Sequence, residues 1–178
     1  NGVFNGIYNL ISHWAGLPNY TVGSMIFNGG IFYANNSFDT LPETMTYLNY
    51  GNLEINYNQP GSIFMFNKVG MLDSSYPRSG LNVTINGNFN IGGTYNGVFC
   101  SNLAKGPETH IIRGDFNVAN GINSFNGYPA SLSTGNHNTN ITVDGSVNIS
   151  GGTLTFSESN NILSVQISGP YLQTNGQV

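Results

Sequence analysis

The sequence predicts an all-β fold, a parallel β-solenoid (β-helix) that starts with a short N-terminal helical cap. Apolar residues alternate with small polar ones along much of the chain, and glycine or a short polar step interrupts this alternation every few residues. A strand with one buried face requires such a period of two. One glycine-centred pattern also recurs, which indicates supersecondary units stacked on one another.

The recurring pattern is a glycine, here called the anchor glycine, followed by apolar residues two and four positions later. Gly114 precedes Phe116 and Val118 in this way, and Gly145 precedes Val147 and Ile149. The copies recur at intervals of 24 to 36 residues, at Gly23, Gly51, Gly87, Gly114, Gly145 and Gly169, the last with Gln173 in its second apolar place. We expect each copy to belong to one turn of the solenoid.

The unequal spacing requires insertions between strands. Residues 71–80, 100–109 and 126–140 contain proline and glycine among polar residues and are predicted to be such insertions. An antiparallel β-sandwich or jelly roll is the alternative fold. Asn86-Gly87, Asn96-Gly97, Asn126-Gly127 and Asp144-Gly145 are dipeptides that favour tight hairpins.

Residues 1–22 differ from the β-rich repeat domain predicted over residues 23–178. Ile7, Leu10, Ile11 and Trp14 have the spacing of one helix face, and Gly16 and Pro18 would end the helix. A helix this short must pack on something, so we expect a cap over the open end of the solenoid. Alternatively the segment is extended, and Val3, Ile7 and Ile11 line a strand inserted into a neighbouring subunit. If the chain forms filaments, we expect this segment to make the subunit contact, with candidate residues Val3, Ile7, Leu10, Ile11 and Trp14.

Charge is scarce in this chain. Only 7% of residues are charged, the net charge is −4, and the four basic residues lie far apart in the sequence. Nucleic-acid binding needs clustered cations, so we expect none. No apolar run approaches the roughly 20 residues that span a bilayer, so we expect no membrane span.

No catalytic, cofactor or metal motif stands out. His13, His110 and His137 are isolated and are predicted to lie on the surface, and Cys100 is predicted to be a small buried residue, with a reactive or intermolecular thiol as the alternative. Asp115 and Asp144 adjoin anchor glycines and could stack with asparagines at one corner. Inward-facing asparagines could form ladders between turns, although turn geometry alone also explains them; the candidates are Asn86, Asn88, Asn90, Asn117 and Asn148.

Residues 81–95 and 141–154 resemble turns of secreted prokaryotic β-solenoid surface proteins, which include adhesin stalks and extracellular filament proteins. The resemblance implies a non-enzymatic structural or adhesive role at the cell surface. We therefore expect self-assembly into a homo-oligomer, or contact with neighbouring segments of the same surface protein. A carbohydrate-binding or carbohydrate-cleaving module that uses exposed tyrosines on glycans is one alternative, and a virion structural protein is another.

Overall fold

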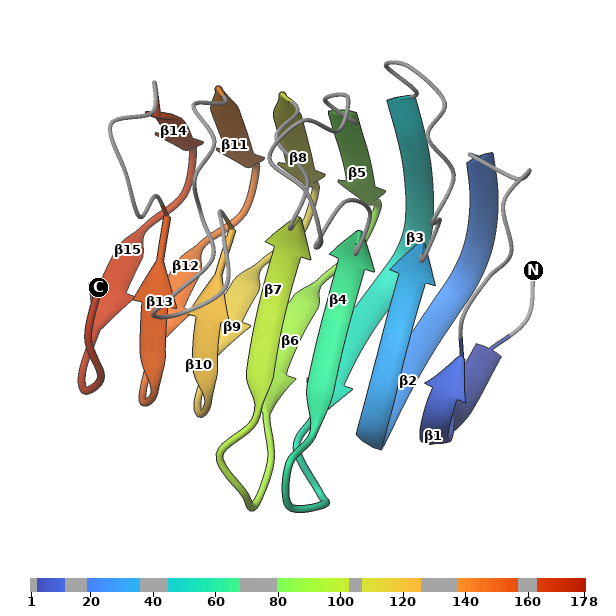
Figure 1. Ribbon diagram of the computed structural model, residues 1–178. Coiled ribbons are helices and arrows are strands. Elements are labelled where there is room, and N and C mark those ends of the chain that lie inside the picture. Colours follow the sequence, from blue (N-terminus) through green and yellow to red (C-terminus); the bar gives the residue numbers. More distant parts are fainter. Residues whose placement is uncertain are drawn as a thin grey trace.

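The computed structural model describes residues 3–11, 19–35, 45–67, 80–102, 107–125, 138–156 and 163–178. These residues form one large, curled, all-parallel β-sheet with a solenoid-like architecture (Figure 1). Its strands are β1 (Val3–Ile11), β2 (Asn19–Asn35), β3 (Met45–Asn56), β4 (Ile63–Asn67), β5 (Gly80–Ile85), β6 (Phe89–Gly92), β7 (Val98–Asn102), β8 (Glu108–Ile112), β9 (Phe116–Val118), β10 (Ile122–Ser124), β11 (Thr139–Val143), β12 (Val147–Ile149), β13 (Thr153–Thr155), β14 (Leu163–Ile167) and β15 (Tyr171–Gln173).

The strands lie in three parallel stacks, which we call the first, second and third sides. The first side runs from the start of β2 through β3, β5, β8 and β11 to β14. The second side runs from β1 through β2, β3, β6, β9 and β12 to β15. The third side runs from β1 through β2, β4, β7 and β10 to β13. The chain therefore visits the three sides in the same order in each turn.

The parallel pairing confirms the predicted parallel β architecture and contradicts the antiparallel sandwich. Every strand pair among the described residues is parallel. The Asn-Gly and Asp-Gly dipeptides at Asn86-Gly87 and Asp144-Gly145 form corners between the first and second sides and not hairpins. At each corner the chain continues onto the next side, so the two strands that flank the corner do not pair with each other.

The anchor glycines stack at this corner. The amide of Gly87 donates to the carbonyl oxygen of Gly51 at 2.6 Å, and Gly114, Gly145 and Gly169 continue the ladder at 3.0 to 3.2 Å. The positions two residues after each glycine align on the second side; they are Met25, Leu53, Phe89, Phe116, Val147 and Tyr171. The sequence repeat is thus the structural repeat.

The prediction of an N-terminal helical cap is wrong, because Val3–Ile11 forms strand β1, which pairs with the edge of β2. Its pairing has two irregularities, between Gly6 and Tyr8 and between Asn9 and Ile11. Ile7 and Leu10 are the positions of β1 that have no partner in this register. The edge of β2 offers a ladder of backbone hydrogen bonds with two interruptions, whereas a helix of two turns is marginal in water. Trp14 lies outside the described residues.

Aromatic side chains fill much of the interior. Phe27, Phe64, Phe99, Phe125 and Phe156 are in consecutive contact, with ring centroids 5.4 to 6.3 Å apart. Cys100 is fully buried on the outer face of the third side beside Tyr33 and Met65, as predicted for a small buried residue. No helix in the described part of the chain is long and apolar enough to cross a membrane.

Candidate functional site

The C-terminal end of the sheet exposes side chains whose counterparts one turn earlier are buried. Leu163 and Val165 of β14 are 39% and 37% exposed, and Tyr171 of β15 is 47% exposed. The residues aligned with them one turn earlier are Thr139, Ile141 and Val147, and all three are buried. We call Leu163, Val165, Ile167, Tyr171 and Gln173 the open end. These side chains are exposed because no described strand lies beyond them.

The backbone at the open end is also available for pairing. Among the described strands, β14 pairs only with β11 and β15 pairs only with β12, so each has one edge without a ladder. An exposed strand edge presents N–H and C=O groups that can pair with another chain. The open end therefore combines apolar side chains with a strand edge that pairs with no described strand.

The residues predicted to contact another subunit lie at the opposite end of the sheet. Val3, Ile7, Leu10 and Ile11 all belong to β1, which pairs with β2 on one side and with no other described strand. Figure 1 shows β1 and β15 at the two ends of the second side. The molecule therefore has two strand edges, one at each end of the same stacks.

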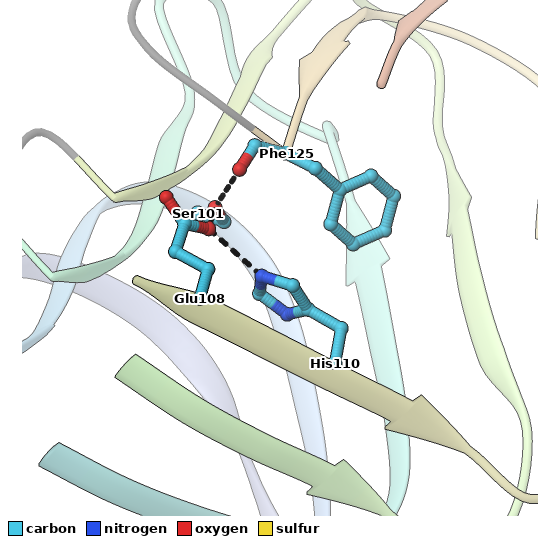
Figure 2. Close-up of polar contacts among 4 residues, drawn as sticks. All are labelled: Ser101, Glu108, His110 and Phe125. Atoms are coloured by element: carbon cyan, nitrogen blue, oxygen red, sulfur yellow. Dashed lines mark hydrogen bonds and ion pairs between the residues drawn. The ribbon is translucent and has the colours of Figure 1, made fainter. Parts of the chain in front are cut away.

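A polar cluster lies inside the coil, far from these ends. Figure 2 shows Ser101, Glu108 and His110 converging beneath the backbone of Phe125. His110 Nε2 lies 2.8 Å from Glu108 Oε2, and the Ser101 hydroxyl lies 2.5 Å from the same carboxylate oxygen. Ser101 also makes a short contact with the carbonyl oxygen of Phe125. The donor and acceptor roles in the contact between His110 and Glu108 depend on the tautomer of the histidine ring.

This cluster has residue types found in the active sites of hydrolases, but solvent does not reach its side chains. All three side chains are at most 2% exposed, and the space beside His110, lined by Phe66, Val83 and Phe89, has no room for a water molecule. The serine also faces the carboxylate and not the histidine, so the base is not placed to activate it. The cluster is arranged to satisfy buried polar groups and not to bind a substrate.

His110 is not on the surface, contrary to the prediction from sequence. His110 aligns with Val83 and Ile141, and Glu108 aligns with Leu81 and Thr139. These positions are four and six residues before the anchor glycine, and alternation places both inside the coil. Alignment of the turns on the anchor glycine was the signal that could have located the pair. His13 and His137 lie outside the described residues.

A second buried polar contact joins three turns. The Tyr57 hydroxyl donates to Asn123 Oδ1 at 2.8 Å, and Asn123 Nδ2 donates to the carbonyl oxygens of Asn120 and Thr153 at 3.0 Å. Burial raises the pKa of Tyr57 well above its usual value. Side chains at Gly97 and Gly121 would overlap the tyrosine ring, so these glycines make space for it.

Asparagine ladders link successive turns. Asn117 Nδ2 donates to Asn90 Oδ1 at 2.7 Å, and Asn148 Nδ2 donates to Asn117 Oδ1 at 2.8 Å. The ladder expected for Asn90, Asn117 and Asn148 is confirmed, but these side chains alternate with the buried residues of the second side and so face outward.

The corner has its own ladder. Asn88 Oδ1 accepts the amide of Asp115 at 2.9 Å, and Asp115 Oδ1 accepts the amide of Ser146 at 2.8 Å. Asn86 instead donates from Nδ2 to the carbonyl oxygen of Tyr50 at 3.2 Å.

Metal binding finds no support in the described ranges. They contain no group of three or more His, Cys, Asp or Glu side chains close enough to hold an ion. Asp144 pairs with Arg113 on the surface at 3.2 Å. The two aspartates beside anchor glycines therefore have structural partners of their own.

No protein-family model matches the sequence, and neither curated proteins nor solved structures include a significant match.

Proposed function

We propose that the chain is a non-enzymatic β-solenoid building block of an extracellular filament or surface stalk. The observation that carries this proposal is the coil itself, whose described strands stack in parallel on three sides around an apolar interior. Each turn packs on the turns before and after it, so such a coil is a repetitive element suited to building a stalk or a filament.

The sides of the coil support a structural role. The outward positions of β5, β8 and β11 carry only uncharged residues, namely Asn82, Thr84, Thr109, Ile111, Asn140 and Thr142. Among the described residues, Glu108 and His110 are the titratable side chains that pair inside the coil, and they are sealed from solvent. Such faces add no charge repulsion between neighbouring molecules.

Imaging and hydrodynamics test the proposal together. The purified chain, concentrated in stages, is examined by negative-stain electron microscopy and by light scattering after size exclusion. We expect rods of constant width whose length grows with protein concentration. Compact particles with the mass of one chain at all concentrations would contradict the scaffold role.

Glycan binding is a second candidate function, favoured by Tyr47. Its side chain is 44% exposed and aligns with Asn82 on the uncharged outer face of the first side. Exposed aromatic rings stack on sugar rings. A glycan array, with a Tyr47→Ala variant beside the unmodified chain, tests this function. Signal lost in the variant supports it, whereas no signal from either protein removes it, and release of reducing sugar would indicate cleavage.

A further inference from the structure

We infer that the outer face of the first side binds an extended, uncharged polysaccharide. One sugar ring stacks on a tyrosine of β3, and the units that follow accept and donate hydrogen bonds along β5, β8 and β11. The side chains concerned form one column, here called the outer row, which consists of Tyr47, Asn82, Thr109 and Asn140. This inference rests on glycan binding as the candidate function and names the class of glycan.

The outer row points away from the interior of the coil. Tyr47 aligns with Asn82, and Thr109 aligns with both Asn82 and Asn140, so the row crosses four hydrogen-bonded strands. The residue that follows each member is buried, and these four residues are Leu48, Val83, His110 and Ile141. Side chains alternate between the faces of a strand, so the outer row lies on the opposite face.

The polar groups of the outer row are available to a ligand. Among the described residues, no hydrogen bond involves the side chains of Asn82, Thr109 or Asn140. The outward amides of the second side differ, because Asn117 and Asn148 donate to the preceding turn at 2.7 and 2.8 Å. Amide and hydroxyl side chains both donate and accept, as sugar hydroxyl groups do. The first side therefore offers the complementary groups that the second side uses internally.

The lack of charge on this face favours an uncharged glycan. The neighbouring outward column is also uncharged and consists of Asn49, Thr84, Ile111 and Thr142. Carboxylate and sulfate groups of anionic polysaccharides are best bound by Arg or Lys. Arg113, which directly follows β8, already pairs with Asp144 at 3.2 Å. An anionic chain would therefore lose its hydration without gaining a cation.

The length of the outer row favours an extended chain. Parallel strands about 4.8 Å apart place Tyr47 and Asn140 about 14 Å apart over three strand steps. One sugar ring cannot reach both residues. Tyr47 is 44% exposed, so its ring is accessible for stacking at one position of the row. Hydrogen bonds farther along the row then add affinity only for a ligand of several units.

Affinity electrophoresis tests the class of glycan. The unmodified chain is run in native gels that contain a neutral β-glucan, a neutral galactomannan or the anionic polymer polygalacturonate. We expect retardation by at least one neutral polymer and none by polygalacturonate. Long oligosaccharides cut from the retarding polymer should compete with it, and its disaccharide should not.

Substitutions test whether binding uses the outer row. Tyr47→Ala removes the stacking ring and Asn140→Ala removes a hydrogen-bonding group, so each should weaken binding by about twofold to tenfold. The matched controls are Tyr95→Ala and Asn96→Ala, because Tyr95 is also 44% exposed and both residues lie between β6 and β7. The controls should bind like the unmodified chain, and all four variants should keep its circular dichroism spectrum.

The outcomes separate this inference from the glycan-binding function. Retardation by polygalacturonate, or equal competition by the disaccharide, would overturn the inference and leave glycan binding standing. Binding that tolerates both outer-row substitutions, or that the controls weaken equally, would do the same. No retardation by either neutral polymer would also overturn the inference, and a blank glycan array in addition would overturn both.

Discussion

Glu108 and His110 are the residues whose surroundings differ most from those of their counterparts in adjacent turns. Both occupy interior columns in which the preceding turn has Leu81 and Val83. Their 2.8 Å contact, together with Ser101, satisfies polar groups that would otherwise be costly to bury. A buried polar pair of this kind is weak evidence for stability, because well-packed apolar residues often serve as well.

The pair therefore predicts opposite effects for single and double substitutions. His110→Ala leaves the carboxyl group of Glu108 buried without its histidine and should lower the free energy of unfolding by about 3–5 kcal/mol. The double variant Glu108→Leu and His110→Val copies the preceding turn and should restore most or all of that loss. Urea unfolding measures both. A double variant less stable than His110→Ala would show that the pair is required for packing.

Tyr57 makes stability depend on alkaline pH. Burial raises its pKa well above the usual 10.0 in the folded chain, whereas the unfolded chain ionises near 10.0. Its contribution is therefore fully present below about pH 10 and is lost as the pH rises above that value, since only the unfolded state releases the proton. Tyr33 has a pKa raised by burial in the same direction.

The variant Tyr57→Phe separates the two contributions of this side chain. At neutral pH it leaves Asn123 Oδ1 without the tyrosine donor and should cost about 1–3 kcal/mol. Between about pH 9 and pH 11 its stability should fall less than that of the unmodified chain, because one buried ionisable group is gone. Urea midpoints at the two pH values provide the measurement. Equal slopes would exclude Tyr57 as the source of the alkaline loss.

At the scale of an element, the corner between the first and second sides requires the backbones of successive turns to lie very close together. A Cβ atom at Gly51 would overlap the carbonyl oxygen of Gly23, so the backbone itself would have to move. The same corner is held by amide donation to Asn52 Oδ1 and Asn88 Oδ1, both at 2.9 Å. The recurrence of glycine is thus a steric requirement of stacking.

Gly51→Ala and Gly92→Ala form a matched pair that tests this requirement. A Cβ atom at Gly92 would lie 3.6 Å from Ala119 Cβ, an ordinary contact. Gly51→Ala should cost about 1–3 kcal/mol or more through overpacking, which lowers the melting temperature by about 2–4 °C for each kcal/mol. Gly92→Ala should leave it nearly unchanged. Similar melting temperatures for the two variants would contradict the corner model.

At the scale of the whole molecule, each turn packs on the turns directly before and after it. Such a structure is nearly one-dimensional, so an end differs from the middle only in lacking a neighbour. Val165 and Tyr171 are exposed, whereas Ile141 and Val147 one turn earlier are buried. This contrast measures the effect of the missing neighbour.

Much of the fold could be predicted from local pattern. The anchor glycine with its two apolar partners encodes the corner and the following strand, because both requirements are local and steric. The N-terminal segment could not be predicted in this way. Residues 7, 10 and 11 have the spacing of one helix face. Pairing with the edge of β2 nevertheless makes this segment a strand. The exposed surface at the open end could not be predicted from the sequence either, because Val165 has the same alternating pattern around it as a buried residue.

The sequence by itself determined the period, the parallel stacking and the corners, because these depend on residue size and alternation at short range. Only the tertiary structure decided which polar residues are enclosed and which side chains of the described strands are exposed. The burial of His110 depends on neighbours about 30 residues away in either direction, and the exposure of Tyr171 depends on the absence of a described strand beyond β15. Both are properties of contacts distant in sequence, which alternation alone does not encode.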